Sequence, residues 1–189
     1  MEKKKIAEIS QIKTWCELKG LSISQSQLER FGQYLSMVRE FSKKMNLVSK
    51  KDLPSLAERH LVDSLNALAA YEFPQGAIVA DLGSGAGFPG IPIAIARPDL
   101  SITLIESRRL KCLFLEKVVS ELALFNVIVV HSRWEKLSDK FDVILSRAVY
   151  PEPELLKIAL LRLGPSGVLL YFEKYMKIKI IGNPSTGHT

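Results

Sequence analysis

The sequence is poor in cysteine and has no long hydrophobic run. Its 189 residues include two cysteines, Cys16 and Cys112, which are too few and too far apart for a disulfide framework or a zinc cluster. Apolar runs such as residues 127–130 and 168–172 are far too short to span a bilayer. No apolar segment of signal-peptide length follows the lysine-rich start. We therefore expect a cytoplasmic protein with reduced thiols and no membrane association.

Acidic residues are scarce in the first third of the chain. The net charge is +6, and residues 1–60 hold 12 lysines and arginines against 7 aspartates and glutamates, so nearly the whole excess lies there. A basic module joined to a neutral one favours an anionic partner, most simply a nucleic acid. A solvated, lysine-rich helical surface would give the same count.

The first 70 residues have helical periodicity. Ser24 and Gln27 fit a capping box, and an apolar stripe follows it. We predict a helix over that stripe, a shorter helix over residues 6–16, a loop near residues 45–48 and a third helix over residues 55–70. The stripe consists of Leu28, Phe31, Leu35, Val38 and Phe41.

From residue 77 onward, short apolar strands alternate with helices. Strands are predicted at residues 77–82, 101–106, 127–131, 141–146 and 168–172, with helices over residues 108–124 and 152–163 among the intervening segments. This alternation indicates an α/β fold with a mostly parallel sheet and helices on both faces. We therefore predict a basic helical extension over residues 1–72, a Rossmann-like core over residues 73–181 and a flexible tail over residues 182–189.

A glycine-rich turn follows the first predicted strand. Residues 81–90 read Asp-Leu-Gly-Ser-Gly-Ala-Gly-Phe-Pro-Gly, and ligands bind at this edge of open parallel sheets. Gly83 and Gly85 let a ligand approach the backbone closely. Glu106 ends the next strand, where a carboxylate can accept hydrogen bonds from ribose hydroxyls. Each feature alone has a structural explanation, but together they predict a nucleoside site.

The turn does not match a dinucleotide site. Such a turn needs a third glycine at position 88, which is Phe88, and Pro89 and Pro92 remove backbone donors that would bind a diphosphate. We therefore predict S-adenosylmethionine as the cofactor. Asp81 would then lie near its positively charged methionine end, unless the amides of the turn satisfy that carboxylate instead.

Several short motifs together resemble one family. They are residues 46–48 (Asn-Leu-Val), 59–64 (Arg-His-Leu-Val-Asp-Ser), 81–92, 104–107, 132–135 and 146–148 (Ser-Arg-Ala). The chain is similar to the bacterial 16S ribosomal RNA (guanine-N7) methyltransferases, also called glucose-inhibited division protein B. The resemblance implies a class I S-adenosylmethionine-dependent methyltransferase that acts on small-subunit RNA or the 30S particle. We expect the protein to work as a monomer.

The resemblance also implies roles for individual residues. Gly83 and Phe88 line the cofactor pocket, and Trp134 and Glu135 hold the adenine edge. Arg147 lies at the mouth shared by cofactor and target base. Two polar residues of the N-terminal part face the same cleft as substrate-binding residues, Asn46 and His60.

The reaction needs few catalytic groups. Guanine N7 carries an exposed lone pair and requires no deprotonation before it attacks a methyl group. The absence of an obvious Ser-His-Asp set, metal cluster or nucleophilic cysteine agrees with this, and we assign no acid, base or metal site. Arg147 can contact guanine O6, an RNA phosphate or the cofactor carboxylate, or it can pair structurally with Asp142 or Glu135.

The C-terminal part departs from the family. Phe-Glu-Lys stands at residues 172–174 where the family usually has Leu-Lys-Gly, and only residues 177–181 remain where a helix and two antiparallel strands usually follow. We expect one or both edge strands to be missing. An inactive RNA-binding or ribosome-assembly protein on the same scaffold therefore stays open as an alternative function. A nicotinamide-dependent oxidoreductase is a third possibility, although the misplaced third glycine argues against it.

Overall fold

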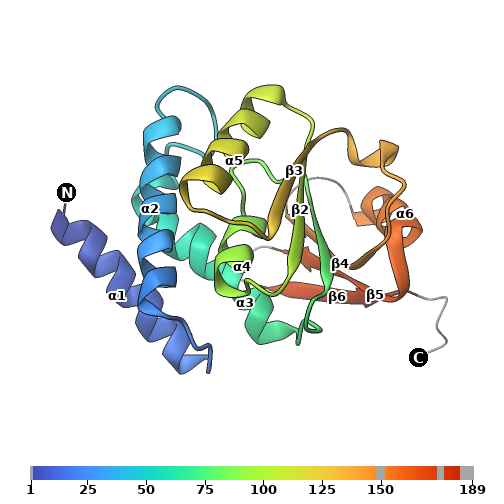
Figure 1. Ribbon diagram of the computed structural model, residues 1–189, viewed down its shortest axis with the longest axis horizontal. Coiled ribbons are helices and arrows are strands. Elements are labelled where there is room, and N and C mark those ends of the chain that lie inside the picture. The colour runs from blue at the N-terminus through green and yellow to red at the C-terminus, as the bar shows by residue number, and fades with distance from the viewer. Residues whose placement is uncertain (1, 148–151, 174–176, 184–189) are drawn as a thin grey trace.

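The computed structural model describes residues 2–147, 152–173 and 177–183 (Figure 1). It begins with two helices of equal length, α1 (Glu2–Leu18) and α2 (Gln25–Phe41). The predicted capping box is confirmed, because Ser24 Oγ accepts from the Gln27 amide and Gln27 Oε1 accepts from the Ser24 amide. The first helix is longer than predicted, since its lysine-rich first turn favours helix without showing apolar periodicity.

The third helical region is not a single α-helix. It consists of a 3-10 turn η1 (Leu53–Ser55), a π-helix η2 (Ala57–Val62) and helix α3 (Asp63–Ala70). The prediction of one regular helix over residues 55–70 was therefore wrong in its geometry. A π turn widens the helix locally, and such turns are frequent at functional sites.

In the described part of the chain, six strands form one sheet in the order β3-β2-β1-β4-β5-β6. All neighbouring pairs are parallel except β5 with β6, which is antiparallel. The strands are β1 (Ile78–Leu82), β2 (Ser101–Glu106), β3 (Val127–His131), β4 (Phe141–Arg147), β5 (Leu163–Phe172) and β6 (Ile178–Gly182). The predicted mostly parallel sheet is confirmed.

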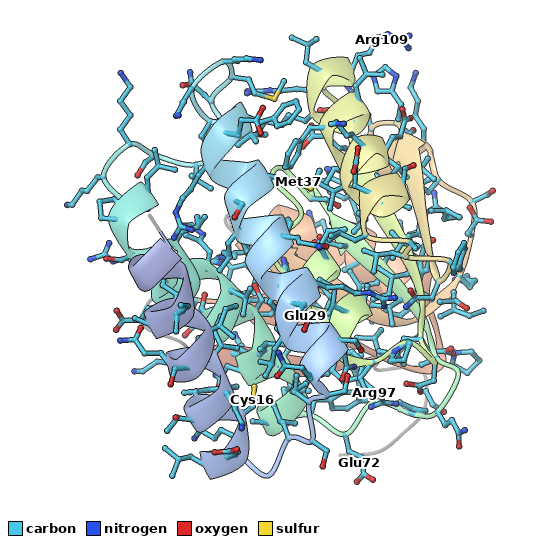
Figure 2. The ribbon with its side chains drawn as sticks, turned by 60° about the vertical axis from the view of Figure 1, so that its left-hand side comes forward. Cys16, Glu29, Met37, Glu72, Arg97 and Arg109 are labelled. Atoms are coloured by element: carbon cyan, nitrogen blue, oxygen red, sulfur yellow. The ribbon has the colours of Figure 1, made fainter. Side chains whose placement is uncertain are left out.

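Helices cover both faces of the sheet. Strand residues alternate between two apolar clusters, so that Val79 packs with α2, α4 (Gly90–Ala96) and α5 (Arg109–Glu121). Its neighbour Ala80 packs on the other face with α6 (Glu152–Arg162) and the short helix η3 (Trp134–Lys136). Figure 2 shows α1 and α2 in front of the first face.

The N-terminal helices are attached to the sheet domain by apolar packing and by side-chain hydrogen bonds. Gln27 Nε2 donates to the carbonyls of Ile95 and Ala96 at the end of α4, at 2.8 and 3.0 Å. Phe31 of α2 belongs to the same cluster as Ile91 of α4. This packing fixes α2 against the segment that contains the glycine turn. The domain boundary near residue 72 stays a prediction.

One antiparallel strand closes the C-terminal side of the sheet. Strand β5 begins directly after α6, five residues before the predicted start at 168, and a register shift opposite Phe141 and Val143 takes up the extra residues. Strand β6 then covers β5 through five residue pairs. Gly182 therefore belongs to a strand, and most of the predicted tail lies outside the described residues. None of the described helices has the length and apolarity to cross a membrane.

Candidate cofactor and substrate site

The glycine turn folds back over the end of β2. The amides of Gly83 and Ser84 both donate to the carbonyl of Ile105, at 2.9 and 3.0 Å. Gly83, Gly85 and Gly87 have φ values of 69°, 59° and 100°, which side chains rarely adopt. Of the atoms in the described residues, a Cβ added to Gly85 would meet only the Gly83 carbonyl at 3.7 Å and Lys111 Nζ at 3.8 Å. The turn is therefore bent sharply, and its backbone is open on the Gly85 side.

The Glu106 carboxylate points toward this turn, as predicted. The residue is 6% exposed, and its Oε2 accepts from the Gly85 amide at 3.0 Å. Its Oε1 accepts from the Arg108 amide at 2.8 Å. The Ser107 hydroxyl also donates to Oε1, at a longer 3.4 Å. Each carboxylate oxygen has two acceptor positions, so Oε2 keeps one for a ribose hydroxyl, and a second ribose hydroxyl would take the place of the long Ser107 contact on Oε1. The position of Glu106 thus fits a nucleoside seated across the turn.

Asp81 is a buried acid behind the same turn. It is 1% exposed, and its Oδ2 accepts from the Gly90 amide at 3.1 Å. Burial raises the pKa of Asp81 to about 7, although hydrogen bonds from Gly90 and Ser84 and the positive charge of Arg147 act in the opposite direction. The turn therefore satisfies one oxygen of Asp81 and leaves a group that a ligand cation would ionise.

The rings of Tyr34 and His60 both pack against Phe88. The Phe88 ring centroid lies 5.0 Å from that of Tyr34 and 5.2 Å from that of His60. Tyr34 is fully buried on α2, and its hydroxyl donates to the carbonyl of Ala86 at 2.9 Å. Tyr34 adjoins Leu35 of the apolar stripe, but no pattern in the sequence predicted its contact with the turn. This hydrogen bond ties the N-terminal helices directly to the glycine turn.

Arg147 pairs with a residue that the sequence did not suggest. Its Nη2 lies 3.0 Å from Asp63 Oδ2 and donates to the Arg59 carbonyl at 2.8 Å. Asp142 instead accepts from the Ile78 amide at 2.8 Å. The structural alternative in which Arg147 pairs with Asp142 was wrong, because Asp142 and Arg147 lie at opposite ends of β4. The alternative partner Glu135 has no described side chain.

Buried polar atoms without hydrogen-bond partners concentrate here. Among the described residues six side chains have such an atom, and four belong to the π-helix, the start of α3 and the end of β4: His60 Nε2, Asp63 Oδ1, Ser146 Oγ and Arg147 Nη1. Each such group costs about 1–3 kcal/mol. Their concentration at the ligand-binding edge of the sheet indicates a site that a ligand completes.

His60 is held in its neutral form. Burial, followed by the charge of Arg147, lowers the pKa of His60 to about 4, although Asp52 acts in the opposite direction. Asp52 Oδ2 lies 3.8 Å from His60 Nε2, and Asp52 Oδ1 accepts from Arg59 Nη1 at 2.9 Å. A neutral imidazole beside the Phe88 ring can stack on a base without competing for protons near neutral pH.

Three predicted residues remain: Asn46, Trp134 and Glu135. Asn46 is exposed in the loop after α2, and no contact in the described part of the chain joins it to His60 or Arg147. Trp134 is buried in the cluster on the other face of the sheet, with Ile105 among its members. Glu135 lies in η3, and its side chain is outside the description. The roles of all three stay predictions.

Comparison with solved structures identifies the fold. The fold is similar to coclaurine N-methyltransferase bound to N-methylheliamine and SAH, with a TM-score of 0.55, 17% identity, and coverage of 90% of this chain and 51% of that chain. It also resembles a SAM-dependent methyltransferase from Thiobacillus denitrificans in complex with S-adenosyl-L-homocysteine, at a TM-score of 0.51, 18% identity, and coverage of 71% and 52%. The fold is that of a class I S-adenosylmethionine-dependent methyltransferase.

Sequence comparison defines the family. The rRNA small subunit methyltransferase G family (GidB) matches residues 27–181, and the chain belongs to it. Ribosomal RNA small subunit methyltransferase G of Clostridium beijerinckii is 35% identical, over 86% of this chain and 75% of its own length. The protein of the same name from Clostridium perfringens is 37% identical, over 73% and 60%. These two alignments span three quarters and three fifths of the relatives' own lengths. Across the described residues, no cluster of His, Cys, Asp and Glu could hold a metal ion.

Proposed function

We propose that this chain transfers a methyl group from S-adenosylmethionine to N7 of a guanine in small-subunit ribosomal RNA. Family membership supports the reaction, and the position of Glu106 against the glycine turn carries the proposal for the site. We further propose that the protein acts as a monomer in the cytoplasm, on the RNA or on the 30S particle.

The residues around the turn fit the cofactor. Glu106 would accept hydrogen bonds from the ribose hydroxyls, and Asp81 would attract the positively charged methionine end. The open backbone at Gly85 leaves room for the nucleoside. When bound, S-adenosylmethionine supplies a methyl group on a positively charged sulfur. By family resemblance, Trp134 and Glu135 would hold the adenine.

The other residues would align the target base. Guanine N7 needs no general base, so His60 and Arg147 act by orientation. Neutral His60 can stack on the base next to Phe88, and Arg147 can donate to the base edge. Alignment of the reactants is worth about 7–11 kcal/mol of barrier reduction in well-oriented systems. Water exclusion at this buried group strengthens the orienting hydrogen bonds.

A basic loop next to the site is suited to bind the RNA backbone. The loop after α2 carries four exposed lysines, Lys43, Lys44, Lys50 and Lys51. It is joined to the site through Asp52, which contacts Arg59, whose carbonyl accepts from Arg147. Phosphate contacts from such a loop would position the RNA and make its affinity salt-dependent.

Transfer of labelled methyl groups tests the proposed function. We expect the protein, incubated with radiolabelled S-adenosylmethionine and either small-subunit RNA or 30S particles that lack the modification, to place label on N7 of one guanine. Large-subunit RNA serves as the control and should stay unlabelled. If calorimetry shows that the cofactor binds but neither substrate is labelled at a guanine N7, the proposal is wrong.

Cofactor affinity should increase as the pH rises through about 7. Asp81, with a pKa of about 7, is mainly protonated at lower pH, and a cationic cofactor favours its ionised form. Binding below that pH must therefore release a proton, so affinity for S-adenosylmethionine should rise about tenfold between roughly pH 6 and pH 8. Calorimetry in buffers of different ionisation heat measures both quantities. Asp81→Asn should remove this dependence; an equal slope in the variant would contradict the assignment.

A further inference from the structure

Asp63 and Arg147 form an ion pair through one carboxylate oxygen and one guanidinium nitrogen. Arg147 Nη2 makes both contacts, at 3.0 Å to Asp63 Oδ2 and 2.8 Å to the Arg59 carbonyl. Arg147 Nη1 and Asp63 Oδ1 are buried and have no hydrogen-bond partner within the described residues. An unpartnered donor thus lies beside an unpartnered acceptor within one ion pair. The pair reaches the surface through Arg147, whose side chain is 21% exposed, while that of Asp63 is 9% exposed.

The pair lies next to the cofactor turn. Ser146 of β4 pairs with Leu82 of β1 in the sheet. The next residue of each segment, Arg147 and Gly83, therefore lies at the same edge of the sheet. Arg147 is also close enough to Asp81 for its charge to act on that carboxylate. Asp63, at the start of α3, lies on the other side of Arg147. The order across the site is therefore cofactor turn, Arg147, Asp63.

This order matches the edge of a guanine. In that base N7 is followed around the ring by O6, an acceptor, and then by N1–H, a donor; adenine has a donor at N6 followed by an acceptor at N1. We propose that Arg147 and Asp63 together select guanine, with Arg147 Nη1 donating to O6 and Asp63 Oδ1 accepting from N1–H while N7 faces the cofactor. This inference rests on the proposed function and adds Asp63 as a specificity-determining residue.

The free protein already holds the pair in place. The Arg59 carbonyl and Asp63 Oδ2 fix the same nitrogen of Arg147, so the guanidinium plane is oriented before the base arrives. Pre-oriented groups lose less conformational entropy on binding. Adenine would place its N6 donor against the Arg147 donor and its N1 acceptor against the Asp63 acceptor. Sites that leave buried polar groups unpaired with the wrong ligand discriminate most strongly between related ligands.

Asp63→Asn tests the selection. The amide would direct its oxygen to Arg147 and place its NH2 group where Oδ1 now lies, which replaces an acceptor by a donor. The nucleotide that the wild type labels is first mapped, and 30S particles with guanine or adenine there are compared. We expect kcat/KM for guanine to fall about 10- to 100-fold and the preference for guanine over adenine to narrow about tenfold or more. Cofactor affinity should stay unchanged, and Asp63→Glu should recover part of the loss.

The matched control breaks an ion pair elsewhere. Asp99 pairs with Arg97 at 2.7 Å, and Figure 2 places Arg97 far from Arg109, which follows Glu106 at the start of α5. Asp99→Asn should leave both rates unchanged. Equal losses for guanine and adenine in Asp63→Asn would mean that Asp63 only supports the fold, which overturns the inference.

A second measurement uses the wild-type protein with altered RNA. Particles assembled from ligated RNA carry N1-methylguanine or inosine at the mapped nucleotide. N1-methylguanine lacks the N1–H and should be methylated about 10- to 100-fold more slowly than guanine, whereas inosine keeps N1–H and O6 and should be accepted. Normal methylation of N1-methylguanine overturns the inference and leaves the proposed function intact. Absence of label on unmodified particles and RNA would instead refute the function itself.

Discussion

Replacing Gly83 by aspartate is expected to weaken S-adenosylmethionine binding by at least about 100-fold, or about 2.7 kcal/mol. Gly83 has a φ of 69°, and its amide donates to the Ile105 carbonyl at 2.9 Å. A side chain would strain this conformation and occupy space over the turn, where the nucleoside must approach the backbone. Titration calorimetry with the wild type and the variant measures the loss.

Gly20 provides the matched control. It has a φ of 70°, almost the same as Gly83, and a Cβ added there would meet no atom of the described residues within 4 Å. Gly20→Asp therefore introduces the same backbone strain and the same charge in the turn between α1 and α2. We expect it to bind the cofactor with wild-type affinity. A similar loss in both variants would show that strain alone reduces binding, and unchanged affinity in Gly83→Asp would move the cofactor site elsewhere.

The sequence was sufficient to predict the sheet and the sharp glycine turn after β1, because both depend on local patterns. Apart from Asp81, the strand from Ile78 to Leu82 has apolar side chains on both faces, as a strand buried between two layers must have. The glycines after it have the positive φ values that only their lack of a side chain makes easy. Glu106 faces the turn because parallel strands bring their carboxyl ends to the same edge of a sheet.

The partners within the candidate substrate site could not be predicted in this way. Arg147 and Asp63 are far apart in sequence, and only the docking of the N-terminal helices brings them to 3.0 Å. The contact of Tyr34 depends on the same docking, since its hydrogen bond to Ala86 joins α2 to the turn. The π-helix from Ala57 to Val62 could not be predicted either, because so short a segment gives no hydrophobic repeat that differs from that of an α-helix. One signal was present: the spacing of His60 and Asp63 in the motif that carried the family resemblance.

Replacing Gly90 by alanine is expected to reduce the stability of the fold by about 3 kcal/mol, at the upper end of the cost of overpacking a core. A Cβ on Gly90 would overlap Leu104 Cδ2 and lie 2.7 Å from Asp81 Oδ2. Neither neighbour can move freely, because both are buried on adjacent strands and the Gly90 amide itself donates to Asp81. The expected fall in Tm is about 6–12 °C for a chain of this size.

Gly164→Ala separates this effect from the general cost of a larger side chain. Gly164 is also buried, but its Cβ would meet the Phe141 carbonyl at 3.5 Å and Asp142 Oδ1 at 3.9 Å, which are ordinary contacts. We expect its Tm to stay close to the wild-type value in calorimetric scans. Because the crowding at Gly90 also displaces the Asp81 carboxylate, Gly90→Ala should weaken S-adenosylmethionine binding at temperatures where it remains folded, whereas Gly164→Ala should not. A Gly90→Ala protein as stable as the wild type would show that α4 can move away from β1 and β2, and the close packing of the helix start against Asp81 would then not be needed to hold the cofactor turn.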